Sequence, residues 1–310
     1  MIPFQFSIPI SHTHLRPPGP TWYNHIMKGV IVAAGYGTRF LPATKTVPKE
    51  LLPLVDTPSL QFIIDEFTAS GVDEILVISS RRKKALEDYL DREIELELAL
   101  ERAGKRDLLA RIAPPRAHVF IVHQQEMRGT GHALLCARPF IGDEPFVVAY
   151  PDDLHFGNPP LTAQLIRTYR ETGCCVLASI HDPPDLSRYG VLKLAQDGIH
   201  VEDMVEKPAP GTEPSREVSI GRYLFTPDVF PLLEEGWKAH TGGEYYHLYA
   251  LRRLMAQGKV VHTRVEGKRI DTGEPSGYLE AILEYALTRD DLRVPLERWI
   301  SRHVGFFDGT

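Results

Sequence analysis

A short apolar run followed by a turn of small residues constrains this chain more than any other feature. Residues 30–32 read Val-Ile-Val, which is typical of a buried central strand. The turn that follows contains two glycines, which can adopt positive φ and let the backbone approach a ligand closely. Backbone N–H groups of such a turn bind phosphate oxygens. The segment therefore predicts a phosphate site formed by Ala33, Ala34, Gly35, Gly37 and Thr38.

Three cations follow the turn at short intervals, at Arg39, Lys45 and Lys49. A glycine-rich turn with spaced cations fits a polyphosphate. The alternatives are a dinucleotide-binding fingerprint and an ordinary loop. The fingerprint requires a third glycine where this chain has Phe40, and a helix that the prolines at 42, 48, 53 and 58 interrupt. We therefore expect an extended loop that lies across a ligand.

Composition limits the class of protein. The chain has 310 residues, of which 43% are hydrophobic and 25% charged, enough for one large α/β domain or two smaller ones. A net charge of −6 argues against a general basic surface for nucleic acid, so positive charge for a phosphate ligand has to be concentrated locally. No apolar stretch is long enough to cross a membrane. The adjacent cysteines Cys174 and Cys175 lie in an apolar run, which indicates buried thiols in a reducing cytoplasm.

The two ends of the chain differ in pattern from the middle. Residues 1–26 contain five prolines and show no clear period, and Met27 stands directly before the first strand. We expect this extension to be disordered, or Met27 to be the natural start. Residues 290–310 are polar and weakly patterned and are expected to form a C-terminal arm. The catalytic domain is then expected at residues 28–289.

The middle of the chain alternates strands with helices. Apolar residues at helical spacing between 60 and 67 precede a strand at 74–79, so the sheet begins as a parallel βαβ unit. Residues 81–112 are charged and helical and are expected to form a solvated insertion without chemistry of its own. Further strands are expected at 119–122, 146–150, 174–180, 217–225 and 259–265. The predicted fold class is α/β, Rossmann-like, with a mixed, mostly parallel central sheet flanked by helices.

Three strand ends carry polar side chains of interest. Gln124 precedes a glycine turn that would suit the reading of a base edge, although locally an ordinary turn is the better explanation. Asp152 and Asp153 follow a buried strand, where α/β sheets bind ligands; they either hold Mg²⁺ together with substrate phosphates or cap the next turn. Glu206 and Lys207 are adjacent opposite charges, which by themselves indicate a surface ion pair of little energetic value.

The loop that starts at Gly35 reads G-x-G-T-R-x-x-P-x-T-K-x-x-P-K and resembles the signature of the sugar-1-phosphate nucleotidyltransferases. The order of all the motifs, from about residue 28 to 288, is similar to that of the bacterial UTP–glucose-1-phosphate uridylyltransferases. The resemblance implies a nucleotide-diphospho-sugar transferase fold. It also implies the Mg²⁺-dependent transfer of UMP from UTP to glucose 1-phosphate, and a homo-oligomer.

The resemblance also implies roles for individual residues. Arg39 and Lys49 would bind the nucleotide phosphates, and Gln124 and Gly129 would meet the uracil edge. Asp152 would hold Mg²⁺, with Asp271 as a second metal ligand or a support for Asp152. The sugar phosphate would meet the remaining residues: Gly190 and Glu206 at glucose hydroxyls, and Lys207 at the phosphate.

One stretch departs from the pattern of these enzymes. They usually show Gly-Asp-Glu-Ile-Gln-Leu-Thr-Asp where this chain has Gly-Gly-Glu-Tyr-Tyr-His-Leu-Tyr at residues 242–249. The change affects the expected sugar specificity and the oligomer contact, and we expect it not to touch the nucleotide loop. It leaves open the same reaction with dTTP or another sugar phosphate. It also leaves open a weakly active homologue that binds nucleotide sugar and regulates an active partner.

Overall fold

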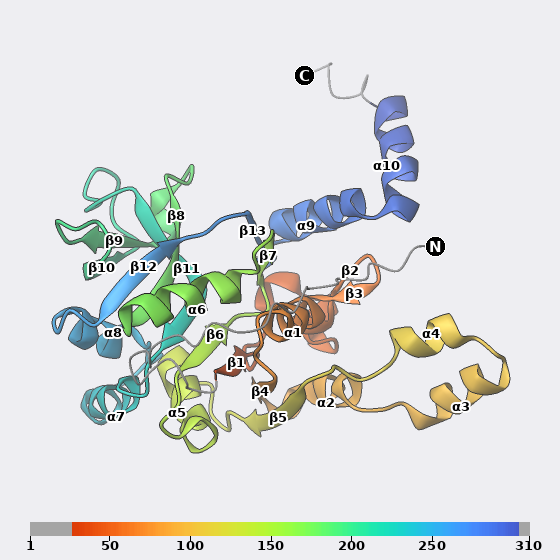
Figure 1. Cartoon of the computed structure of the whole chain (residues 1–310), viewed down its shortest axis with the longest axis horizontal. Helices are drawn as coiled ribbons and strands as arrows, with labels where there is room; N and C mark the ends of the chain where they lie inside the picture. The colour runs from red at the N-terminus through yellow and green to blue at the C-terminus, as the bar shows by residue number, and fades with distance from the viewer. Residues whose placement is uncertain (1–26, 304–310) are drawn as a thin grey trace, which may run out of the picture.

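The computed structural model describes residues 27–303, which are built around a nine-stranded mixed sheet (Figure 1). Our expectation for residues 1–26, and the end of the arm at 304–310, lie outside the described residues. At the centre of the sheet, β1 (Lys28–Val32) lies between β4 (Glu74–Ser79) and β6 (Phe146–Ala149) and is parallel to both. β5 (His118–His123) continues the parallel half to one edge.

The other half of the sheet is mostly antiparallel. β11 (Glu217–Phe225) pairs antiparallel with β6, β8 (Cys175–His181) and β9 (Gly190–Leu194). β10 (Val201–Glu206) continues from β9, and β12 (Val260–Arg264) runs parallel to β8. Two short sheets stand apart, one of β7 (Asp153–Phe156) with β13 (Lys268–Asp271) and one of β2 (Pro53–Leu54) with β3 (Thr57–Pro58). The expected α/β class, with a mixed central sheet flanked by helices, is confirmed.

Helices cover both faces of the sheet because its central strands are apolar on both sides. Ile31 of β1 belongs to one buried cluster and its neighbour Val30 to the other. Successive side chains of a strand point to opposite faces, so each face gains its own core. The first core is completed by α1 (Ser59–Ala69), α2 (Lys84–Leu90), α6 (Leu161–Thr172) and α9 (Pro275–Thr288). The second is completed by α5 (Thr130–Ile141), α7 (Val229–Ala239) and α8 (Leu248–Met255).

The expected insertion at residues 81–112 is only partly correct. α3 (Ile94–Arg102) and α4 (Arg106–Arg111) contain no buried residue and project from the body as a pair (Figure 1). α2 instead contributes Leu86 and Leu90 to the first core, so the start of this range is structural rather than solvated. At the other end of the chain, α10 (Asp290–His303) is helical and extends beyond α9 (Figure 1).

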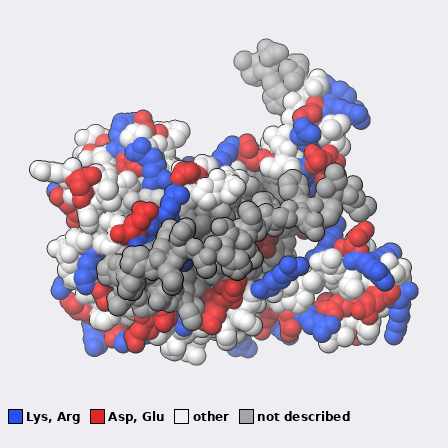
Figure 2. Space-filling model, in the orientation of Figure 1, with Lys and Arg blue, Asp and Glu red and all other residues white. Residues whose placement is uncertain are grey.

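Charges of both signs are interspersed over the face of the molecule shown in Figure 2. Within residues 27–303, none of the helices combines the length and the hydropathy that crossing a bilayer requires.

A buried ion pair joins α1 to the middle of the sheet. The guanidinium of Arg222, on β11, is fully buried and pairs with Glu66 of α1. It also donates to the Thr162 hydroxyl at 3.2 Å and to the Asp153 carbonyl at 3.3 Å. Removal of one partner leaves the other charge buried without compensation, which is more costly than losing the pair itself.

We expect Glu66→Gln to lower the free energy of unfolding by roughly 3–5 kcal/mol, because the charge of Arg222 then lacks its partner. The double variant Glu66→Gln/Arg222→Met should recover part of that loss. Guanidinium unfolding at pH 7 measures both. Lys193→Ala is the control, since its pair with Glu202 is about half exposed and should be worth ~1 kcal/mol or less. A cost for Glu66→Gln as small as that of the control would contradict the prediction.

Candidate functional site

The loop after β1 folds back on itself instead of extending. Gly37 takes a φ of +69°, as the sequence allowed, but three successive 3₁₀ turns follow. The Thr44 hydroxyl donates to the Gly37 carbonyl at 2.7 Å, and a Cβ at Gly37 would lie 3.3 Å from the Cβ of Lys49. The expectation of an extended loop is therefore wrong. The compact form returns Lys49 to the glycine turn from which the chain departed.

A cavity of about 380 Å³ opens at the carboxyl end of β1. Its size lies within the range of small-molecule sites. Its wall brings together three segments that are distant in the sequence: the glycine turn, the end of β5 and the end of β6. The expected residues that line it are Gly35, Gly37, Thr38, Lys49, Gln124, Gly129 and Asp152, together with Ala34. Lys45 does not line this cavity and lies with Arg82 in a separate small hollow.

An ion pair between Lys49 and Asp152 forms the charged centre of the cavity. Lys49 Nζ lies 2.5 Å from Asp152 Oδ2. Burial alone would raise the pKa of Asp152, but the adjacent ammonium outweighs it and holds that pKa below its usual value. Burial likewise would lower the pKa of Lys49, and the charge of Asp152 raises it overall. Both groups are therefore charged at neutral pH.

Arg39 and Asp271 join this centre around Gly273. A Cβ at Gly273 would lie 3.0 Å from an oxygen of Asp152, 3.0 Å from an oxygen of Asp271 and 3.4 Å from Arg39 Nη1. Two carboxylates and a guanidinium thus converge on one point. Arg39 is also paired with Glu274, at 3.3 Å, and its side chain is well exposed. Arg39, Lys49 and Asp152 therefore lie together.

Asp153 has a different role from its neighbour. Its carboxylate accepts from the backbone N–H of Gly221 at 2.8 Å and pairs with Arg269 at 2.8 Å. These bonds turn it into the protein, where it holds β7 and β13 against β11. Only Asp152 of the two adjacent carboxylates faces the cavity.

Gln124 and Gly129, which also line the cavity, are joined by a hydrogen bond. The Gln124 side chain is buried and donates to the Gly129 carbonyl at 3.1 Å, and it also lies 3.0 Å from His132 Nδ1. Gly129 has a φ of +92°, a conformation that a side chain would strain. The turn therefore requires a glycine here, and the glutamine fixes its carbonyl.

The residues expected at the sugar do not line this cavity. Gly190 and Glu206 are paired across β9 and β10, and a Cβ at Gly190 would lie 3.0 Å from Glu206 Oε2. Lys207 is exposed, and its N–H donates to the Tyr189 carbonyl at 2.9 Å. Tyr246 belongs to the stretch at 242–249. Its hydroxyl donates to Glu244, which lines the cavity, and this bond, with burial and the charges of Glu244 and Glu206, raises the pKa of Tyr246.

The structure adds a buried pair that the sequence did not reveal. Lys83 Nζ lies 2.7 Å from Glu50 Oε1 and donates to the Ala33 carbonyl at 2.6 Å. Both side chains are buried. Ala33 does not line the cavity, and its part in the site is to receive this bond at the start of the turn. Because Glu50 directly follows Lys49, the sequence could have indicated it as a residue of the site. Lys83 could not be found in this way, because it lies in a basic run that is typical of a solvated surface.

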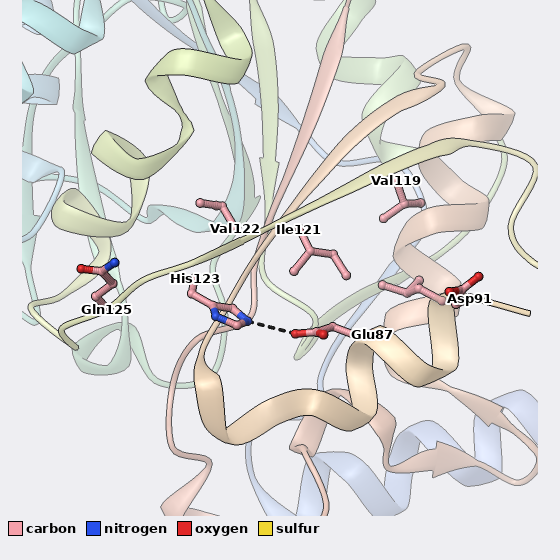
Figure 3. A pocket seen from close by; sticks show the side chains of 8 residues that line it. Glu87, Asp91, Val119, Ile121, Val122, His123 and Gln125 are labelled. Carbon is pink, nitrogen blue, oxygen red and sulfur yellow. Dashed lines mark hydrogen bonds and ion pairs between the residues drawn. The ribbon is translucent and has the colours of Figure 1, made fainter.

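A second and larger hollow, of about 710 Å³, lies between α2 and β5. Figure 3 shows His123 paired with Glu87 there, at 3.0 Å, with Asp91 nearby. The residues that line it include two carboxylates and no lysine or arginine. Because phosphates are anions, this hollow does not fit a nucleotide, and the smaller cavity does.

Part of the stretch at 242–249 lies at this cavity and at the turn that contains Gly129. Glu244 lines the same cavity as Gly35 and Gly129. The backbone of Tyr245 is hydrogen-bonded to the turn that contains Gly129. Of the changed residues, Tyr245 therefore contacts the turn at 128–131.

His247, in the same stretch, allows a test of how this segment packs against the sheet. It is buried against the rings of Tyr223 and Phe225, and its Nδ1 lies 2.9 Å from the Thr130 hydroxyl. Burial lowers its pKa to about 4. Because the unfolded histidine titrates near its ordinary value, the unfolded chain binds the proton first as the pH falls. Stability from this group is complete above about pH 6.5 and is lost toward pH 4.

We expect the loss of unfolding free energy between pH 7 and pH 5 to be about 2 kcal/mol smaller in His247→Asn than in the parent chain. Asparagine keeps a polar partner for Thr130 but does not titrate. Urea unfolding at the two pH values measures the difference. Identical losses in the two proteins would show that His247 is not buried in its neutral form.

Comparison with known proteins places these features in context. The profile of the family described as "Nucleotidyl transferase" matches residues 28–287. The chain is 40% identical over 283 residues to UTP–glucose-1-phosphate uridylyltransferase 2 of Staphylococcus saprophyticus, covering 89% of this chain and 98% of that protein. It is 39% identical over 287 residues to the enzyme of the same name from Staphylococcus haemolyticus, covering 91% and 99%.

Solved structures of similarly named enzymes also match the fold of this chain. A UDP-glucose pyrophosphorylase from Acinetobacter baumannii superposes with a TM-score of 0.82 at 33% identity, covering 89% of this chain and 99% of that one. A pyrophosphorylase complexed with UDP-glucose superposes with a TM-score of 0.73 at 36% identity, covering 85% and 100%.

Proposed function

The chain belongs to the nucleotidyl transferase family, and we propose that it transfers UMP from UTP to glucose 1-phosphate, giving UDP-glucose and pyrophosphate. The observation that carries the proposal is the Lys49–Asp152 pair, 2.5 Å apart, in a cavity walled by the glycine turn. The curated relatives are named for this reaction, and a UTP-bound UGPase from Acinetobacter baumannii has a similar structure. The chain covers nearly the whole length of these relatives.

The reaction joins two anions. An oxygen of the sugar phosphate attacks the α-phosphorus of UTP, the new phosphorus–oxygen bond forms, and the bond to the β-phosphate oxygen breaks to release pyrophosphate. The attacking phosphate is already ionised, so no general base is required. Catalysis therefore comes from holding the two groups in line and from neutralising their charge.

The residues around the cavity are assigned to these tasks. The backbone of the turn from Ala34 to Thr38 holds the nucleotide, with Ala33 fixing the start of that turn, and Lys49 and Arg39 bind the phosphates. Gln124 and Gly129 meet the uracil edge. Gly190 and Glu206 contact the glucose hydroxyls, and Lys207 contacts the sugar phosphate. The nucleotide assignments are supported by the convergence of Arg39, Lys49 and Asp152, and the sugar assignments by the pairing of Gly190 with Glu206 across β9 and β10.

The donor set fits a magnesium ion, which Asp152 and Asp271 would hold. Proteins usually bind Mg²⁺ through one or two carboxylates, with substrate phosphates and water as the other ligands. The convergence of these two carboxylates matches that requirement. Among residues 27–303 no group of three or more His, Cys, Asp or Glu side chains is arranged for a metal, so the substrate would complete the coordination. When bound, the ion would supply further positive charge to the phosphates.

We expect Lys49→Ala and Asp152→Asn each to lower turnover by at least about 10²–10³-fold, by analogy with the loss of other charge-stabilising groups. Lys45→Ala is the matched control, because this neighbouring lysine of the same loop does not line the cavity. Continuous measurement of pyrophosphate release gives the rates, and circular dichroism confirms folding. Near-normal rates in either variant would overturn the assignment.

A panel of UTP, dTTP, ATP, CTP and GTP with glucose 1-phosphate tests the proposal as a whole. We expect UTP to give the highest kcat/KM. A preference for dTTP would replace the assignment with thymidylyl transfer, and absence of pyrophosphate with every nucleotide would favour a regulatory homologue.

We further infer that residues 28–289 form the catalytic unit and that it acts in the cytoplasm as a homo-oligomer. The family match to residues 28–287 supports the extent of the catalytic unit. The three free cysteines support a location in the cytoplasm. Exposed apolar side chains on α3 and α4 (Ile94, Leu96, Leu98 and Leu108) and on the edge strand β5 (Phe120 and Ile121) support the third.

A further inference from the structure

We propose that Tyr245 is a positioning residue that holds the turn at residues 128–131 and thereby sets the affinity of the site for the nucleotide base. The inference rests on the proposed function, in which this turn meets uracil. It concerns the stretch at 242–249, whose sequence departs from the pattern expected from the resemblance.

Two backbone hydrogen bonds clamp the turn to Tyr245. The N–H of Tyr245 donates to the Arg128 carbonyl at 2.7 Å, and the N–H of Gly131 donates to the Tyr245 carbonyl at 2.8 Å. The approach is too close for side chains on the turn. A Cβ at Gly129 would lie 2.6 Å from the Tyr245 carbonyl oxygen, and one at Gly131 would lie 2.7 Å from its ring. The turn therefore cannot shift unless Tyr245 shifts with it.

The side chain of Tyr245 is itself anchored to α7. It is buried, its hydroxyl donates to the Leu233 carbonyl at 2.8 Å, and its ring centroid lies 5.6 Å from that of Trp237. Gly236 makes the space, since a Cβ there would overlap with the tyrosine hydroxyl. An isoleucine at 245 has no hydroxyl to reach this carbonyl. The tyrosine and the glycine therefore form a matched pair that fixes the clamp to a rigid helix.

The clamp reaches the base through Gln124. The glutamine amide donates to the Gly129 carbonyl, so the position of that carbonyl sets the orientation of the glutamine in the wall of the cavity. A turn that loses its anchor has to be ordered by the nucleotide, and that ordering weakens binding. Glucose 1-phosphate is assigned to the other side of the site, around Glu206 and Lys207, and should not be affected.

The test compares Tyr245→Phe and Tyr245→Ala with Tyr249→Phe. The control residue packs in the same notch at Gly236 and bonds to Glu235 of α7, but no hydrogen bond joins it to the turn. We expect Tyr245→Phe to raise the KM for UTP about fivefold, since one buried hydrogen bond is lost, and Tyr245→Ala to raise it further. The kcat and the KM for glucose 1-phosphate should stay within about twofold, and Tyr249→Phe should match the parent chain in every constant.

Equal changes in both KM values, a fall in kcat alone, or an unchanged KM for UTP in Tyr245→Phe would overturn the positioning role. Calorimetric titration of UTP into the same proteins separates this inference from the proposed reaction, because it needs no turnover. If the parent chain binds UTP without reacting, only the proposed reaction is refuted. The Kd values of the variants for UTP then test the positioning role, with the same fold-changes expected as for the KM for UTP. Failure of the parent chain to bind UTP overturns both. If Tyr245→Ala does not fold, Tyr245→Phe alone decides, since it keeps the ring.

Discussion

The close pair of Lys49 and Asp152 is the interaction on which the rest of the site depends. The protein carries a net charge of −6, yet its proposed ligands are a triphosphate and a sugar phosphate. Opposite charges 2.5 Å apart in a half-buried site keep each other ionised, as the two pKa shifts show. In the proposed mechanism, the substrate phosphates replace Asp152 as the ion-pair partner of Lys49. The carboxylate of Asp152 is then free to bind a cation. The site is therefore charged before the substrate arrives.

A second ion pair, which includes the residue directly after Lys49, holds the loop that positions Lys49. Glu50 and Lys83 are buried side by side, and Lys83 also bonds to the Ala33 carbonyl. One lysine thus joins the start of the glycine turn, the residue after Lys49 and the end of β4. Burying two charges is expensive and is repaid only by good geometry and further hydrogen bonds. The bond from Lys83 to the Ala33 carbonyl is such a further hydrogen bond, and it holds the loop where it returns to the start of the glycine turn.

The sequence predicts what is local, and the structure supplies what is distant. The strand, the glycine turn and Lys49 lie within about twenty consecutive residues, so their type and spacing predict a phosphate site directly. The compact 3₁₀ form of the loop was missed because prolines exclude a long helix without specifying which turns replace it. The contact between Gly129 and Tyr245 was missed because it joins residues more than a hundred positions apart, and no local pattern records such a contact.

The same limitation applies to residues 242–249. As sequence, the stretch aligned with a sugar-side pattern, and its changes were assigned to sugar specificity. In the fold its Glu244 lines the cavity, and the backbone of Tyr245 bonds to the turn at 128–131. Two anions that repel each other have to be held at a fixed separation. A segment that lines the cavity and is also bonded to one of its walls helps to keep the shape of the site fixed.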